Sequence, residues 1–177
     1  MRLWPYQMLD VLPYRHLLSQ WRECLAIAGT LKSKGELNHS TINRILDYPI
    51  EHFFVYCDLV RIEFARREWT IGENTLEKLK NDINYHCEDL SLIPSIDNEY
   101  STSLYSVFNS EDKNKDCYNK IVKLKDGSKN ILFNDFHNDR YIKQCYYKFQ
   151  EFYDTDALTE EIWDKIYIKF KFLGLEK

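Results

Sequence analysis

The apolar residues in the first half of the chain recur at the spacing of an amphipathic helix, which favours a fold built from long helices. One apolar stripe contains five residues at i, i+4, i+7, i+8 and i+11: Leu17, Trp21, Cys24, Leu25 and Ala28. Pro13 suits the first turn of this helix, where the N–H that proline lacks would have no partner. Gly29 is expected to end the helix, because glycine readily adopts the left-handed conformation of a C-cap.

Other segments predict further helices. Ser40 or Thr41 is expected to cap a short helix that Pro49 brings to an end. Helical spacing is also found over four ranges: 50–66, 76–83, 141–152 and 162–173. The last range also alternates like a strand, but its length favours a helix.

Residues 86–136 lack this period and contain turn-forming residues. Asp126-Gly127 separates two apolar runs, which predicts a β-hairpin. The lysines between positions 113 and 129 are interpreted as a solvated face of this hairpin, with contact to a DNA backbone as the alternative.

The whole chain is therefore predicted to be mainly α-helical. Its 177 residues contain only five Gly and four Pro, fewer turn-forming residues than a many-stranded sandwich needs. We expect one compact domain in three segments: a helical core over 1–85, an insertion with a hairpin over 86–136, and C-terminal helices over 137–177 that pack on the core.

The net charge of −4 and the pI near 5.8 argue against a nucleic-acid-binding protein when the chain is taken as a whole. The charge is unevenly distributed, however. Residues 1–80 carry 11 Lys and Arg against 10 Asp and Glu, whereas residues 81–177 carry 13 against 18. The acidic half is expected to point away from any DNA that the first half binds.

Neither a membrane location nor a metal centre is expected. No apolar run approaches the 18 or so residues that span a bilayer, and the first twenty residues lack a signal-peptide core, so a cytoplasmic protein is predicted. The five cysteines lie about thirty residues apart without a CxxC pair. This spacing argues against disulfides and zinc, and favours buried thiols. No cofactor is expected.

The polar side of the first predicted helix is a candidate site. Two pairs of residues seven apart form its flanks, Arg15 with Arg22 and His16 with Glu23. The small residues Ser19 and Ala26 lie between the flanks, so that cations face a carboxylate and an imidazole across a shallow floor. The alternative is a solvated helix face with ordinary charge patterning.

The amine of Met1 is a candidate nucleophile. Arg2 is a large second residue, so the initiator methionine is expected to be retained. An α-amine has a pKa near 7.7–8.0, so roughly a fifth to a third of it is unprotonated at pH 7.4. Such an amine can form an imine without the lowered pKa that a lysine needs.

The order of several short motifs resembles the pyrimidine-dimer DNA glycosylases of the phage endonuclease V type. Arg2, His16-Leu17 and Arg22-Glu23 carry this resemblance. A longer series is similar to the bacterial branch of the family: Met1-Arg2-Leu3-Trp4, Leu12-Pro13, Leu17-Leu18, Gln20, Arg22-Glu23-Cys24, His39-Ser40-Thr41-Ile42, Tyr48-Pro49 and Tyr56. The series covers about residues 1–69, and a weaker similarity to the family recurs over residues 137–145.

The resemblance implies a helical, metal-free glycosylase and abasic-site lyase that acts on ultraviolet-induced pyrimidine dimers in double-stranded DNA. The amine of Met1 would attack C1′ of the damaged nucleotide, and Glu23 would hold the cationic intermediate and assist removal of a C2′ proton. Arg22 would bind phosphate, and Arg2 and His16 would complete the side of the site beside it. A monomer is expected.

The chain departs from the family pattern at several positions. Ala26 stands where the phage enzyme has a further arginine, which removes one phosphate contact. His16 and Trp21 stand where the bacterial branch usually has glutamine and histidine. The phage enzyme matures to an N-terminal threonine, whereas Met1 itself would be the counterpart here.

Three alternatives remain open at this level. His39, Ser40 and Thr41 could contact a phosphate at a helix N-terminus, or they could form an N-cap around a buried histidine. The chain could be a non-catalytic helical module that binds a nucleic-acid or protein partner. It could also be an amine-dependent lyase that acts on other damaged bases.

Overall fold

The computed structural model describes residues 2–85, 132–133 and 135–172. Its elements, in chain order, are η1 Tyr6–Val11, α1 Tyr14–Lys34, α2 Ser40–Asn43, η2 Arg44–Asp47, α3 Ile50–Arg66, α4 Glu73–Ile83, α7 Asp139–Asp154 and α8 Glu160–Phe172. The described residues contain no strand, so the predicted mainly α fold is confirmed.

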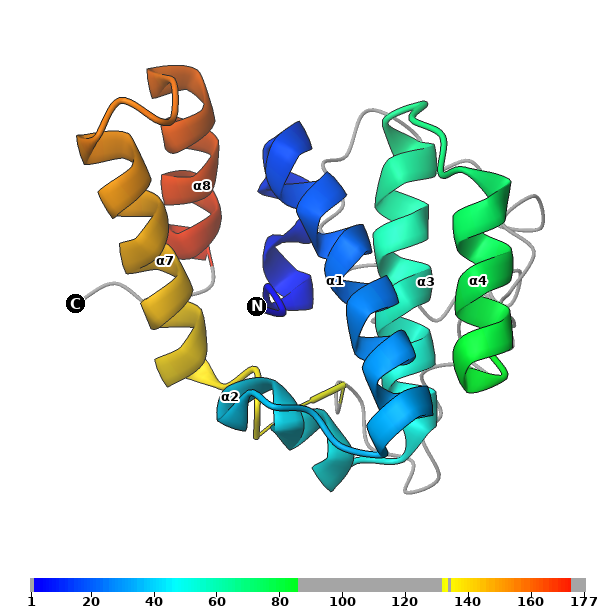
Figure 1. Ribbon diagram of the computed structural model, residues 1–177. Coiled ribbons are helices and arrows are strands. Elements are labelled where there is room, and N and C mark those ends of the chain that lie inside the picture. The colour runs from blue at the N-terminus through cyan, green and yellow to red at the C-terminus, as the bar shows by residue number, and fades with distance from the viewer. Residues whose placement is uncertain (1, 86–131, 134, 173–177) are drawn as a thin grey trace, which may run out of the picture.

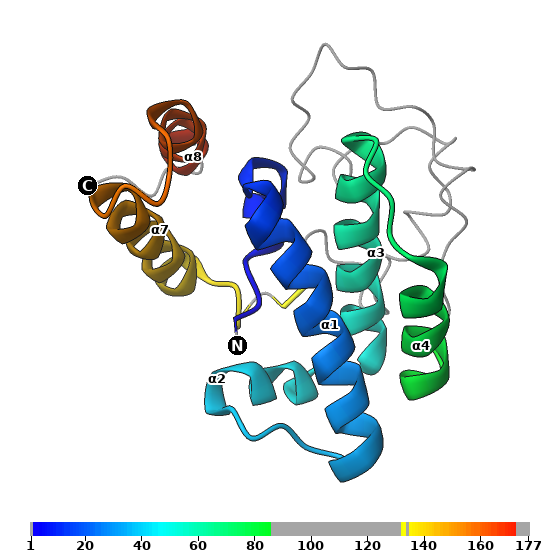
Figure 2. The same ribbon diagram turned by 45° about the horizontal axis from the view of Figure 1, so that its top comes forward.

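Helix α1 lies between the other helices and contacts both α3 and α4. Figures 1 and 2 show α7 and α8 on the opposite side of α1 from α4, with the N-terminal segment between them and α1. The 3₁₀ helix η1 contacts both α3 and α8, so the start of the chain links the two groups of helices.

The predicted end of α1 at Gly29 is wrong. The helix continues to Lys34 and ends at Gly35, which has a φ of 72° and donates its N–H to the carbonyl of Leu31 at 2.9 Å. Gly29 instead faces α4, where an added Cβ would lie 3.5 Å from Oδ2 of Asp82. Packing between α1 and α4 therefore overrides the weak helix propensity of this glycine.

The predicted cap of the short second helix also differs. His39 is the N-cap residue of α2, and its Nδ1 accepts the N–H of Ile42 at 3.4 Å. Neither Ser40 nor Thr41 occupies the N-cap position, because both lie within the helix. The chain then passes directly into η2, and Pro49 immediately precedes α3.

The remaining helix predictions agree with the structure. Helices α3, α4 and α7 cover the ranges expected from the apolar spacing, and the ambiguous last segment is the helix α8. Asp126-Gly127 and the expected hairpin lie outside the described residues. The division into 1–85, 86–136 and 137–177 therefore stays a prediction.

A single large core joins the N-terminal segment to helices from both groups. Its members include Leu3 and Leu9 near the N-terminus, Phe53 of α3, Phe149 of α7 and Ile166 of α8. None of the described helices combines the length and apolarity needed to cross a membrane.

Two charged side chains, Arg67 and Lys169, hold η1 in place. The carboxylate of Glu63 in α3 binds Arg66 and Arg67. Arg67 also donates to the carbonyls of Leu9, Asp10 and Leu12. On the other side, Nζ of Lys169 in α8 lies 2.7 Å from Oδ2 of Asp10. The turn that precedes α1 is thus bonded to both α3 and α8.

Three of the five cysteines are described. Cys24, Cys57 and Cys145 are buried free thiols, as expected. Burial raises the pKa of Cys57 well above its ordinary value and that of Cys145 to about 12, which keeps both thiols protonated. Cys87 and Cys117 lie outside the described residues.

Candidate active site

Side chains from three helices hold the backbone of the N-terminal segment. The N–H of Trp4 donates to Oε1 of Gln20 in α1 at 2.8 Å. The hydroxyl of Tyr56 in α3 donates to the Trp4 carbonyl at 2.7 Å. The hydroxyl of Tyr141 in α7 donates to the carbonyl of Leu3 at 2.8 Å. Residues 2–5 belong to no helix or strand, so these side chains supply bonds that regular secondary structure would otherwise provide.

The side chain of Trp4 is buried between α1 and α7. Its ring stacks on Phe149 with centroids 4.4 Å apart, and His16 meets it edge-on at 6.0 Å. The guanidinium carbon of Arg2 lies 5.2 Å from the ring centroid of Trp4, a cation–π arrangement. The structure thus brings Arg2 and His16 to the same tryptophan, although they come from different elements.

His16 is a neutral, aromatic part of this face. Besides Trp4 it contacts Phe149 and Phe152, with ring centroids 5.7 and 5.2 Å away. Burial lowers the pKa of His16 below its ordinary value of 6.5, so the imidazole is mainly uncharged at neutral pH. It therefore contributes shape and stacking to the site, and its charge contributes little.

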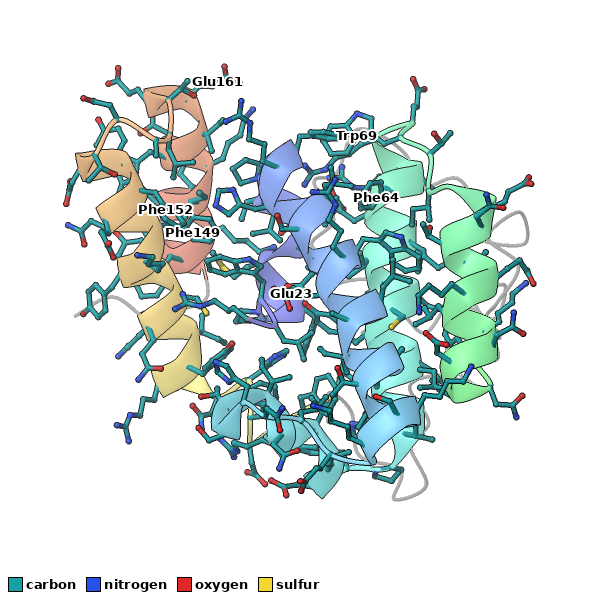
Figure 3. All side chains as sticks on the ribbon, viewed as in Figure 1. Glu23, Phe64, Trp69, Phe149, Phe152 and Glu161 are labelled. Atoms are coloured by element: carbon teal, nitrogen blue, oxygen red, sulfur yellow. The ribbon has the colours of Figure 1, made fainter. Side chains whose placement is uncertain are left out.

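Glu23 lies one turn beyond Gln20 on the same side of α1, since residues three apart share a helix face. Figure 3 shows Glu23 on the side of α1 that faces the N-terminal segment and α7. Its side chain is half-buried, and no described residue forms a hydrogen bond or an ion pair with it. This carboxylate is therefore available to a ligand.

Arg15 and Arg22 are exposed on the outer side of α1. Neither forms an ion pair with a described acidic residue. Several other arginines are paired within the fold: Arg61 with Asp58, and Arg66 and Arg67 with Glu63. Arg15 and Arg22 thus project into solvent without an acidic partner among the described residues, as groups that bind an external anion do.

The other predicted site residues are more dispersed. His39 is half-buried, and its Nδ1 is already used by the N–H of Ile42. Ser40 is exposed and Thr41 is half-buried at the start of α2, an element separate from α1. Met1 lies outside the described residues. Within the part of the chain that is described, no three His, Cys, Asp or Glu residues are placed to hold a metal ion.

The residues that bind the N-terminal backbone were not predicted as site residues. Gln20 is 1% exposed and lies on the buried side of α1, between Leu17 and Cys24. A glutamine on an apolar helix face needs a hydrogen-bond partner, and this was the available signal. Tyr56 belongs to the motif series and Tyr141 to its weaker counterpart, but no sequence pattern indicates that their hydroxyls bind this backbone.

One comparison with known proteins gives a match. Residues 1–77 match the family described as pyrimidine dimer DNA glycosylase, which confirms the family resemblance over this part of the chain. The closer assignment to a phage-like, bacterial branch stays a prediction. No curated protein and no solved structure matches the chain.

Proposed function

We propose that this chain excises pyrimidine dimers from double-stranded DNA and then cleaves the strand through an imine formed by the amine of Met1. The family match over residues 1–77 supports the glycosylase part of this proposal. One structural observation supports Glu23 as the catalytic carboxylate. Its side chain is half-buried and has no ionic partner among the described residues, and it lies on the helix face to which the N-terminal segment is bonded.

The chemistry needs a nucleophile and a carboxylate close together. The amine of Met1 attacks C1′ of the damaged nucleotide, and the base leaves with the electrons of the glycosidic bond. The C1′–O4′ bond then opens to give a protonated imine, and Glu23 stabilises this cation. Glu23 next accepts a C2′ proton, the C3′–O bond breaks by β-elimination, and water hydrolyses the imine.

Arg15 and Arg22 bind the DNA phosphates in this proposal. Their lack of an acidic partner among the described residues supports this role, because an internally paired cation would have to exchange one anion for another. Arg2 and His16 line the side of the proposed site that is formed by Trp4. His39, Ser40 and Thr41 are proposed as an additional phosphate contact at α2.

We further propose a monomeric cytoplasmic enzyme with the segment organisation 1–85, 86–136 and 137–177. The excess of acidic residues lies after position 80, so the proposed DNA-binding face belongs to the neutral half of the chain. This distribution favours weak binding to undamaged duplex, since phosphate contacts dominate non-specific affinity.

Borohydride trapping tests the proposal. The native chain should form a covalent adduct with duplexes that contain a dimer or an abasic site, because borohydride reduces the imine to a stable amine. A variant with one extra residue before Met1 should form none, and the same residue added after Lys177 serves as the control. Equal trapping by the N-terminally extended chain would exclude the α-amine mechanism, and no adduct from the native chain would favour the non-catalytic module.

A further inference from the structure

Three side chains bind two consecutive backbone units just upstream of η1. Gln20, Tyr56 and Tyr141 come from α1, α3 and α7, and they bond to the backbone of Leu3 and Trp4 at 2.7–2.8 Å. We propose that these three are positioning residues that hold the N-terminal segment so that its terminal amine reaches the carboxylate of Glu23. This inference rests on the proposed function, because it gives the amine its nucleophilic role.

The bonds lie in a protected environment. Gln20 is 1% exposed and Tyr56 is fully buried, while Tyr141 is half-buried. Burial raises the pKa of both tyrosines, so each hydroxyl keeps its proton and remains a donor to the backbone carbonyl it binds. A hydrogen bond shielded from water fixes a backbone more firmly than one in which water can replace either partner.

Chain geometry limits where the amine can lie once Leu3 is fixed. A fully extended chain spans at most about 3.3–3.6 Å per residue, so two residues reach about 7 Å. Gln20 and Glu23 are three apart on α1, and Cβ atoms at this spacing are about 5–6 Å apart. Two residues of chain and one helical turn therefore span similar lengths, which supports a short path from the bonded segment to Glu23.

The direction of the segment agrees with this reach. Figure 1 shows the N-terminal segment rising beside α1 toward η1, whereas α1 itself runs downward. The two run antiparallel, so the backbone before Trp4 leads from the turn of Gln20 toward later turns of α1. Figure 3 shows Glu23 on this side of the helix.

Holding the amine in this range affects the rate of reaction more than the affinity for DNA. A misplacement of about 1 Å between reacting groups can cost about 10²-fold in rate. The affinity depends mainly on cations such as Arg15 and Arg22, which lie on the outer side of α1. Loss of a positioning bond should therefore slow imine formation and leave DNA binding unchanged.

The test uses Tyr141→Phe, which removes only the hydroxyl that binds Leu3. With an abasic duplex at saturating concentration, the rate of borohydride-trapped adduct should fall by about 10- to 100-fold, while the dissociation constant stays within twofold. Tyr85→Phe is the matched control. It removes a buried hydroxyl that donates to Asp58, away from the N-terminal segment, and should leave the trapping rate unchanged.

Two further measurements separate positioning from general stability. Hydrogen exchange at the amide of Trp4 should accelerate in Tyr141→Phe but not in Tyr85→Phe. Adding Gln20→Leu to Tyr141→Phe should slow trapping further. A native trapping rate in Tyr141→Phe would overturn this inference alone. Absence of any adduct from the native chain would overturn the proposed function, and this inference with it.

Discussion

The backbone N–H of Trp4 is bonded to Gln20, the residue on α1 that lies one turn before Glu23. An irregular segment at the start of the chain is thereby fixed to the same helix face that presents the half-buried carboxylate of Glu23, which has no ionic partner among the described residues. In the proposed mechanism the nucleophile and the carboxylate come from segments about twenty residues apart, and this bond joins those two segments.

Replacement of the carboxylate should separate binding from cleavage. Glu23→Gln keeps the size of the side chain but cannot accept the C2′ proton, so strand cleavage at an abasic site should fall by at least about 10²-fold. Affinity for the duplex should stay the same or rise slightly, since a negative charge is lost. Single-turnover cleavage and fluorescence anisotropy measure the two effects. The control is Glu73→Gln, at an exposed position in the first turn of α4, and native cleavage by Glu23→Gln would refute the assigned role.

Removal of the outer cations of α1 should weaken DNA binding in a salt-dependent way. Arg15→Ala and Arg22→Ala should each lower the slope of log K against log salt by about 1, because one phosphate contact is lost. Lys80→Ala provides the control, since Lys80 is paired with Glu77 on α4, on the far side of α1. A salt titration that gives the same slope for all four proteins would show that α1 does not contact phosphate.

The two glycines of the α1 region should respond oppositely to alanine. Gly29→Ala should stabilise the fold by about 0.5–1 kcal/mol, because the position is helical and the new Cβ meets Asp82 and Lys78 only at ordinary contact distances of 3.5 and 3.6 Å. Gly35→Ala should destabilise it by about 1 kcal/mol, because φ is 72° there. Urea unfolding measures both, and changes of the same sign would contradict the assignment of the helix end.

The buried carboxylate of Glu63 should be important for stability. Glu63→Gln leaves Arg66 and Arg67 without their buried counter-charge, which should cost about 3–5 kcal/mol of unfolding free energy. Glu77→Gln removes one partner of an exposed pair with Lys80 and should change stability by less than about 0.5 kcal/mol. Similar losses in the two variants would show that burial of Glu63 adds nothing to its pairing.

Acidification should destabilise the fold through His137. Burial among aromatic rings lowers the pKa of His137 from 6.5 to about 3. The unfolded chain therefore binds a proton at pH values where the folded chain does not, and stability is lost as pH falls from about 6.5 toward 3. One proton contributes at most about 1.4 kcal/mol per pH unit. The unfolding free energy between pH 6.5 and 5 should fall less steeply in His137→Phe than in the native chain.

The helical part of the fold could be predicted because apolar spacing determines which face of each helix is buried. The stripe from Leu17 to Ala28 is buried against the core as expected, apart from Leu25, which is only half-buried. The prediction that α1 ends at Gly29 was wrong, because this glycine lies where α4 packs closely against α1 and does not end the helix. The better signal was Gly35, which follows Lys32 and Lys34 in the last turn.

The candidate site could be predicted only in part. Projection of α1 separates exposed Arg15 and Arg22 from His16 and Glu23, which lie on the flank toward α7. The bond from Tyr141 to Leu3 joins residues 138 apart, and no local pattern indicates such a contact. The burial that lowers the pKa of His16 also depends on this long-range packing.

The packing of α7 and α8 on the N-terminal segment has a consequence for folding during synthesis. Tyr141 is 138 residues from Leu3, and Lys169 is 159 residues from Asp10. Closing such long loops carries an entropic cost that contacts within α1, α3 and α4 do not. On the ribosome, the segment with the proposed nucleophile emerges first but gains these partners last. A nascent chain that ends before α7 would therefore lack the bond from Tyr141 to Leu3 and the ion pair between Lys169 and Asp10, and only Gln20 and Tyr56 would hold its first residues.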